Sequence, residues 1–296
     1  MLLGSIEAGG TKFVCAIGDK NFNIIEKASF PTTTPSETMA LVFDFFDQYV
    51  LELKAIGVGS FGPIDVDKNS ETYGYITNTP KIAWQQFNFI GAIEEKYNIP
   101  VAWTTDVNAS ALGEAKTGSG KNKKSVAYFT IGTGIGGGVI QDNMIIEGIT
   151  HPEMGHLLVR RHPDDKFEGS CPFHQDCLEG MACGPAIEQR LGTKGQDVSS
   201  NNPFWDIEAY YIAQMVYNVT INFAPSVVVL GGGVMKQDDM LNKVRKNFSK
   251  LLNEYRPIPA LEDYVVLPEL EDNAATIGCF ALADKITSEA LKIKVL

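Results

Sequence analysis

Residues 126–140 read Val126-Ala-Tyr-Phe-Thr-Ile-Gly-Thr-Gly-Ile-Gly-Gly-Gly-Val-Ile140: an apolar run, a glycine turn and a second apolar run. An Asx turn at Asp142-Asn143 and a third run, Met144-Ile145-Ile146, follow, so the stretch predicts three antiparallel strands. The same order opens the chain, in Leu2–Ile6, Gly9-Gly10-Thr11, Phe13–Ile17, Gly18–Asn21 and Ile24-Ile25. A β-meander that occurs twice, each time followed by mixed helix and strand sequence, predicts a duplicated α/β fold with two lobes and a cleft between them.

Helical patterns follow each copy of the meander. In the first half they cover Ser36–Leu51, Asn88–Tyr97 and Asn108–Lys116, and a strand is expected at Val101–Thr105. In the second half they cover Phe204–Phe223, a segment ending near Leu252 and Asn273–Lys292, and a strand is expected at Val227–Leu230. The polar segment Gly118–Lys124 is typical of a linker. We therefore expect an N-terminal lobe of residues 1–117 and a C-terminal lobe of residues 118–296, whose last helix could cross back to the first lobe.

Composition and charge exclude several classes of protein. The chain has 296 residues, of which 44% are hydrophobic and 21% charged, as in an ordinary globular protein. A net charge of −11 argues against nucleic acid or an acidic membrane surface as a partner. The five cysteines are an odd number, which argues against a disulfide framework. Neither a leader nor a membrane span is evident, so we expect a cytoplasmic protein.

Four potential metal ligands lie close together in the second half of the chain. Cys171, His174 and Cys177 are separated by two-residue gaps, and His156 lies upstream as the natural fourth ligand. Two thiolates and two imidazoles suit a tetrahedral Zn²⁺ ion. Glu153 and Glu179 bracket the cluster, so a metal would hold them in place while they face something else. Two alternatives are a zinc loop with merely solvated glutamates and a cluster that binds no metal.

Three glycine-rich turns follow apolar runs and therefore stand at strand ends. They are Glu7–Lys12, Gly132-Thr133-Gly134 and Gly231-Gly232-Gly233. Glycine lets backbone N–H groups converge on an anion, and three such turns in a duplicated frame favour a nucleotide cleft. Gly132, Gly134 and Gly137 also match a dinucleotide fingerprint, but a strand follows where a helix is needed. Gly120-Lys121 resembles the end of a P-loop, but the rest of that motif is missing.

These motifs together resemble a known family. The duplicated meander is similar to the ATPase fold of actin and hexokinase, and Glu153-x-Gly-His156 with a downstream Cys/His cluster resembles the ROK group of repressors and sugar kinases. Other matching segments are Ser60–Asp65 and Thr77–Pro80 as sugar loops, Thr105–Ala109 as the catalytic segment and Leu230–Gly233 as the adenosine motif. The first phosphate loop begins with Glu7 where Asp is usual, and the metal cluster has His174 among its cysteines. Both departures resemble the fructokinase branch, which implies fructose as the substrate.

The resemblance implies a role for each matching residue, and physical reasoning supports the central one. Asp106 follows a strand and precedes a helix, so its carboxylate would point into the cleft and act as the base for the sugar hydroxyl; an N-cap aspartate is the alternative. ATP would bring Mg²⁺, which Glu7 could reach through water, while zinc would be structural. The implied sugar contacts are Gly62, Asn78, Thr79, Asn108, Glu153, His156 and Glu179. The implied ATP contacts are Gly9, Gly10, Thr11, Lys12, Thr133, Gly134, Pro185, Gly232 and Gly233.

Other functions are weighed against a fructokinase. A repressor of the same group needs a DNA-binding domain before the first phosphate loop, and that loop begins here at Glu7. A non-catalytic sugar-binding protein would follow if Glu7 disabled the use of Mg²⁺. A kinase of glucose, mannose or an amino sugar would keep the same chemistry with another pocket. The resemblance also implies a homodimer.

Overall fold

A five-stranded mixed sheet forms the centre of the first unit. The computed structural model describes residues 1–293. Three antiparallel strands, β1 (Leu2–Ala8), β2 (Lys12–Gly18) and β3 (Ile24–Pro31), form the predicted meander. Two parallel strands, β4 (Leu53–Ser60) and β7 (Val101–Thr105), extend it beyond β1, so the strand order is β3-β2-β1-β4-β7.

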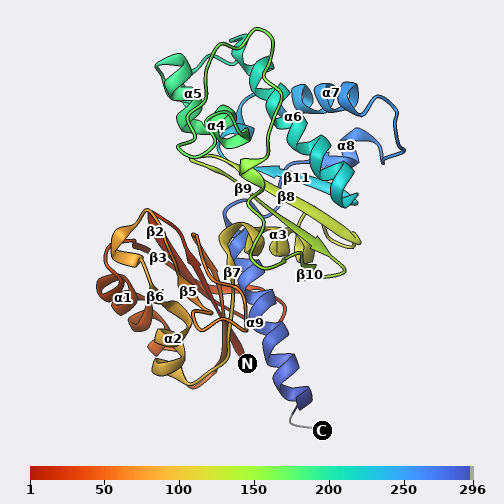
Figure 1. Cartoon of the computed structure of the whole chain (residues 1–296). Helices are drawn as coiled ribbons and strands as arrows, with labels where there is room; N and C mark the ends of the chain where they lie inside the picture. The colour runs from red at the N-terminus through yellow and green to blue at the C-terminus, as the bar shows by residue number, and fades with distance from the viewer. Residues whose placement is uncertain (294–296) are drawn as a thin grey trace. The chain divides into compact units, whose positions relative to one another are not determined.

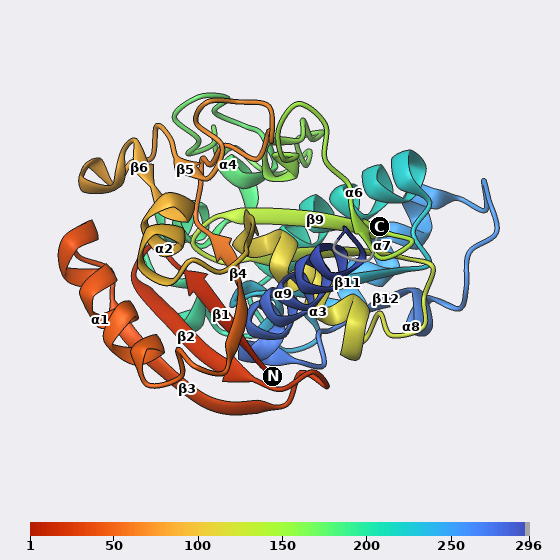
Figure 2. The ribbon, with the colours of Figure 1, turned by 90° about the horizontal axis from the view of Figure 1, so that it is seen from below.

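Helices cover both faces of this sheet. The helices α1 (Pro35–Asp47) and α2 (Phe89–Tyr97) pack on one face, and α3 (Asp106–Thr117) and α9 (Ala274–Ile293) pack on the other (Figures 1 and 2). Helix α1 begins at a capping box in which Thr34 accepts a hydrogen bond from the Glu37 N–H, and the Glu37 carboxylate accepts one from the Thr34 N–H. Glycines allow α9 to approach closely: a Cβ on Gly278 would lie 1.8 Å from the Ala109 carbonyl oxygen of α3.

The second unit repeats the strand order of the first. Its meander consists of β8 (Ser125–Ile131), β9 (Ile135–Gln141) and β10 (Met144–Ile145), and the parallel strands β11 (Val227–Gly231) and β12 (Val265–Val266) extend it beyond β8. The order β10-β9-β8-β11-β12 matches that of the first sheet position by position. The predicted duplicated α/β fold is therefore confirmed.

Helices of the second unit pack around α6 (Phe204–Phe223), which contacts α4 (Leu178–Ala182) and α7 (Met240–Leu252). Helix α5 (Gly184–Leu191) follows α4 after a single residue. The bounds of α6 match the sequence prediction, because Pro203 and Pro225 flank an apolar pattern that can only be helical between them. Buried Trp205, Phe248 and Tyr264 are among the largest side chains of this core.

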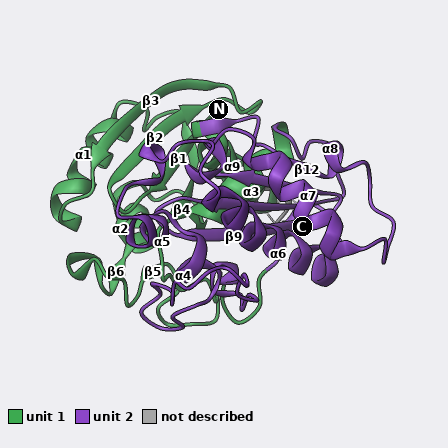
Figure 3. Cartoon of the chain, turned by 90° about the horizontal axis from the view of Figure 1, so that it is seen from above, with its two compact units in different colours: residues 1–117, 147–151, 272–296 green, residues 118–146, 152–271 purple. Residues whose placement is uncertain are grey.

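The two units divide the chain in four places. The first unit holds residues 1–117, 147–151 and 272–296, and the second holds residues 118–146 and 152–271 (Figure 3). The sequence predicts the break at residue 117 and leaves open the place of the last helix, which groups here with the first unit. Nothing in the sequence predicts that residues 147–151 also belong to the first unit. None of the helices within residues 1–293 has the length and hydrophobicity needed to cross a membrane.

Candidate active site and metal centre

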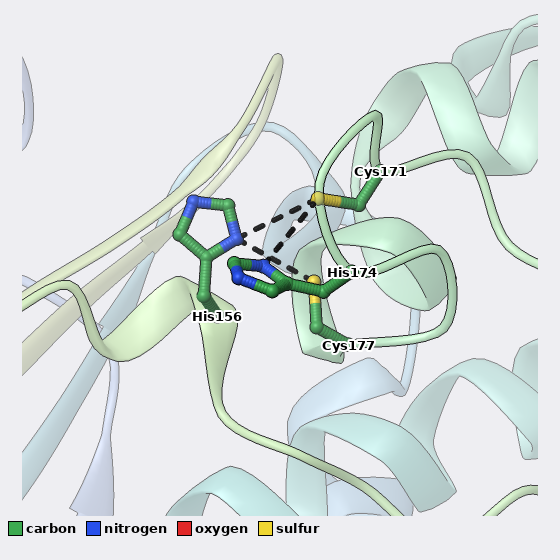
Figure 4. Close-up of side chains that lie close together, drawn as sticks. All are labelled: His156, Cys171, His174 and Cys177. Carbon is green, nitrogen blue, oxygen red and sulfur yellow. Dashed lines mark hydrogen bonds between the residues drawn. The ribbon is translucent and has the colours of Figure 1, made fainter.

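The structure gathers the four expected metal ligands of the second unit. One ligand atom from each of His156, Cys171, His174 and Cys177 lies within 4.8 Å of the others (Figure 4). The His156 Nδ1 atom is 3.5 Å from Cys177 Sγ and 3.8 Å from Cys171 Sγ, and His174 Nδ1 is 3.8 Å from Cys171 Sγ. For ordinary Zn–S and Zn–N bonds, the sulfur–nitrogen edge of a tetrahedron is about 3.6 Å. The donor set and its spacing therefore fit Zn²⁺.

The local chain explains how these ligands meet. Residues Cys171 and Gln175 exchange two backbone hydrogen bonds of 2.9 and 3.2 Å, which close a tight turn that presents His174. Burial raises the pKa of the Cys177 thiol to about 11. A bound cation is what would favour its thiolate at neutral pH, because metal binding displaces the proton.

A buried ion pair braces the loop between His156 and Cys171. The Asp165 carboxylate accepts hydrogen bonds from Arg190 Nη2 at 3.1 Å and from the Tyr211 hydroxyl at 2.8 Å. The Arg190 guanidinium also stands over the ring of Phe167, with its Cζ atom 4.4 Å from the ring centroid. Both side chains of the ion pair are almost fully buried, so neither can lose its partner without leaving an uncompensated charge.

The Glu179 carboxylate binds the second glycine turn. Its Oε2 atom accepts a hydrogen bond of 2.8 Å from the Ile135 backbone N–H. The sequence analysis predicts that Glu179 contacts the sugar. In the structure, one of its two carboxylate oxygens also accepts a hydrogen bond from the Ile135 backbone. No periodicity or motif in the sequence indicates it, since 44 residues separate the two partners.

A cavity of about 740 Å³ lies in the second unit. It is lined by residues of two of the glycine-rich turns and of the segments 184–188 and 194–196, and the predicted contacts Thr133, Pro185 and Gly233 are among its walls. The predicted contacts Gly134 and Gly232 do not line it. Gly232 has a φ of +91° and packs against the Ile131 backbone, so its part is to turn the chain. The sequence analysis missed four further polar walls: Lys194, Gln196, Lys236 and Gln237.

The first glycine turn lies between β1 and β2. Its Gly9 N–H donates to the Lys12 carbonyl at 3.0 Å, and the Thr32 hydroxyl donates to the Gly9 carbonyl at 2.7 Å. A Cβ on Gly10 would lie 3.1 Å from Lys81 Cε, which places a cation beside the turn that the sequence analysis did not consider. Burial raises the pKa of the Glu7 carboxyl, and the Lys27 and Lys12 ammonium groups oppose that rise.

Asp106 begins helix α3 directly after strand β7, as predicted. Its Oδ1 atom accepts a hydrogen bond of 2.8 Å from the Val107 N–H. The bond typical of an N-cap is made instead by Thr105, whose hydroxyl accepts from the Asn108 N–H at 3.2 Å. Asp106 therefore shares the start of the helix with a separate capping residue, which weakens the purely structural alternative.

The other predicted sugar contacts differ in how far their side chains are exposed. Thr79 and Asn108 are each 1% exposed, and the Asn108 amide donates to the Thr104 hydroxyl at 3.2 Å. Asn78 accepts a hydrogen bond of 3.4 Å from the Gln86 side chain. Glu153 is exposed at the start of the short helix Met154–His156. Asp106 and the sugar loops belong to the first unit, whereas Glu153, His156 and Glu179 belong to the second.

The segment of residues 147–151 brings two further polar side chains to the first unit. The Glu147 carboxylate accepts a hydrogen bond of 3.3 Å from the hydroxyl of Thr104, which lies on β7. The His151 side chain is buried, and its Nε2 atom is 3.7 Å from the place that a Cβ on Gly62 would occupy. The sequence analysis missed both residues, because only the tertiary fold assigns this segment to the first unit.

Comparison with known proteins gives one consistent result. The ROK family model matches residues 3–286. A fructokinase of Streptococcus mutans is 52% identical over 97% of this chain and 99% of its own length. A fructokinase of Lactococcus lactis is 52% identical over 95% of this chain and 96% of its own length.

A solved structure shares the fold. The ROK hexokinase of Thermus thermophilus superposes with a TM-score of 0.83, at 24% identity, over 98% of this chain and all of that one. The duplicated sheets of this chain thus follow a known architecture. The chain belongs to the ROK family.

Proposed function

We propose that this protein is a hexose kinase that transfers the γ-phosphoryl group of ATP to D-fructose, giving fructose 6-phosphate. The observation that carries the proposal is the likeness to two fructokinases at about half identity over nearly the whole of both chains. Within that frame, Asp106 stands at the junction of β7 and α3, where a carboxylate can meet a substrate hydroxyl.

The chemistry assigned to Asp106 is proton transfer. The 6-hydroxyl oxygen of fructose forms a bond to the γ-phosphorus, and the bond from that phosphorus to the β–γ bridging oxygen breaks, which leaves ADP. The hydroxyl proton passes to the Asp106 carboxylate. A weak base suits this reaction, because in a loose transition state the proton leaves late.

The nucleotide is assigned to the cavity of the second unit. Thr133, Pro185 and Gly233 line it, and Lys194 and Lys236 supply positive charge on its walls. Gly9, Gly10, Thr11 and Lys12 of the first turn are proposed to contact phosphate, with Lys81 as a further cation. Mg²⁺ would arrive with ATP and keep several of its waters.

The metal centre is assigned a structural role. Zn²⁺ held by His156, Cys171, His174 and Cys177 would have four protein ligands and no open position, and it would supply rigidity to its loop. The His156 ring uses Nδ1 toward the cluster, which leaves Nε2 to face a sugar hydroxyl. Glu153, Glu179, Gly62, Asn78, Thr79 and Asn108 remain the other proposed sugar contacts.

The compartment and the oligomeric state complete the proposal. All five cysteines, which lie in the described part of the chain, are free thiols, and this agrees with a reducing cytoplasm. A homodimer stays a prediction of the family resemblance, and light scattering on the purified protein would test it.

A panel of sugars, assayed for ADP release with saturating ATP and Mg²⁺, tests the function. Fructose is expected to give the highest kcat/KM, with mannose or glucose behind it. A preference for glucose or an N-acetylated sugar would refute fructose as the preferred substrate, but it would still support a sugar kinase. Binding of fructose without ADP release would instead favour a non-catalytic sugar-binding protein.

A further inference from the structure

The metal centre and the second glycine turn are joined by one short helix. Helix α4 begins at the metal ligand Cys177, whose carbonyl accepts from the Met181 N–H at 3.0 Å. A helix of five residues is too short to be stable by itself, so contacts outside it must hold it in place. At its far end the Met181 carbonyl accepts from Arg190 Nη2 at 2.8 Å. Its near end is held by the Cys177 side chain and by a backbone bond of 2.8 Å from Leu178 to Leu157.

Glu179 extends from this helix to the turn. Glu179 lies only two residues after Cys177 in the chain. Its Oε2 atom accepts a hydrogen bond of 2.8 Å from the Ile135 N–H. The turn is shaped for that carboxylate, since a Cβ on Gly134 would lie 2.7 Å from the same oxygen. An alanine at position 134 would displace this carboxylate oxygen, and Gly134 itself has no left-handed backbone conformation.

The same short segment holds the other side of the turn. The Gly184 N–H, at the start of α5, donates to the Gly132 carbonyl at 2.7 Å. Inside the turn, the Gly132 N–H donates to the Gly134 carbonyl at 2.9 Å. Two hydrogen bonds thus join the turn 132–135 to residues 179–184. The bond to Glu179 is the one closer in the chain to the cluster residue Cys177.

We propose that Glu179 is a positioning residue through which the bound metal holds the second glycine turn in its phosphate-binding conformation. With the metal bound, Cys177 fixes the start of α4, and Glu179 keeps Ile135 in place. When the metal leaves, the start of α4 loosens and the Glu179–Ile135 bond weakens, while Arg190 retains the far end. In the sequence analysis, Glu179 links the metal only to the sugar. Its bond to Ile135 would also link the metal to the phosphates of the nucleotide.

Amide hydrogen exchange on the full-length protein without sugar or nucleotide tests the coupling directly. We compare zinc-loaded protein with protein stripped by a chelator, and resolve the Ile135 amide by fragmentation mass spectrometry. Stripping is expected to speed exchange at Ile135 at least about fivefold, the size of one net hydrogen bond. The Val228 amide of strand β11 should stay unchanged. Equal exchange at Ile135 in both samples would overturn the proposal.

Two variants separate the Glu179 contact from general loosening. In Glu179→Ala and in Gly134→Ala the contact is already broken, so stripping should no longer change exchange at Ile135, although zinc content stays at one per chain. Gly132→Ala is the matched control, because its added methyl meets nothing within 4 Å, and it should respond as the parent does. Should Glu179→Ala fail to fold, Gly134→Ala carries the test with the carboxylate intact. A full zinc response in Gly134→Ala would refute the coupling.

A binding measurement extends the test to the nucleotide and rests on the proposed function. Stripping should weaken ADP binding about fivefold or more and leave adenosine binding unchanged, because only ADP has phosphates to meet the turn. Equal losses for both ligands would contradict a coupling through the turn. If no sugar released ADP, the proposed kinase activity would be refuted, but the hydrogen-exchange result at Ile135 would be unaffected. The two proposals can therefore fail independently.

Discussion

Replacing Asp106 by Asn tests the assignment of the catalytic base. The substitution keeps the volume of the side chain and an Oδ1 acceptor for the Val107 N–H, which is 2.8 Å away in the parent. Thr105 still accepts the capping bond from the Asn108 N–H, so α3 should begin at the same residue. The stability of the fold should therefore change by much less than the ~1 kcal/mol of a lost hydrogen bond.

The loss of the proton acceptor should appear in turnover. A positioned base contributes about 10²–10⁴ in rate, which corresponds to about 3–5.5 kcal/mol of transition-state stabilisation. We expect kcat to fall by that factor while the fructose dissociation constant, measured calorimetrically, changes little. Asp106→Ala provides the comparison, since it also removes the acceptor for Val107. Residual activity above one tenth of the parent in Asp106→Asn, or an unfolded variant, would refute the reasoning.

Two further predictions concern the metal and a buried carboxyl. Cys177→Ser removes a thiolate from the cluster, so elemental analysis should find little zinc. Circular dichroism should find a folded protein, because none of the four ligands belongs to the hydrophobic core of either unit. Fructose kinetics equal to the parent's would contradict a role for the metal near the sugar. Glu208 is fully buried, and neither of its oxygens has a hydrogen-bond partner among the described residues. Burial raises the pKa of Glu208 well above its usual value, so the folded state holds this proton more tightly than the unfolded state, and the free energy of unfolding should fall as pH rises from about 4.5 toward the raised value. Glu208→Gln should remove that part of the slope in melting temperatures measured from pH 5 to 8, and a parent and variant with parallel profiles would show that the carboxyl is not the cause.

The fold could be predicted from the sequence because its signals are local. Each meander consists of apolar runs separated by glycine or Asx turns. Within a meander, each strand pairs with the strand next to it in the sequence. The bounds of α6 and the capping of α1 likewise follow from residues within one segment. Helix α1 ends at Asp47, before the predicted Leu51, and residues 48–52 form turns there. Apolar periodicity does not reveal where a helix stops unless a glycine or proline marks the end.

The clustering of the two cysteines and two histidines could be predicted because three of the four lie within seven residues. Short spacing limits the distance between side chains, and thiol and imidazole donors are rarely placed together by chance in a chain with only five cysteines and four histidines. The place of His156 was harder to predict. It approaches the cluster because the Leu178 N–H bonds to the Leu157 carbonyl, a contact between segments far apart in the sequence.

The sequence by itself determined the duplicated sheets, the family, the members of the Cys/His cluster and the position of Asp106 at a strand–helix junction. Only the tertiary structure decided that Glu179 binds Ile135, that Lys81 stands beside Gly10, and that residues 147–151 join the first unit. The physical reason is the range of the interactions. Periodicity, turns and ligand spacing act over a few residues, whereas these contacts join segments 30 or more residues apart and depend on how whole elements pack. No pattern within either segment encodes its partner.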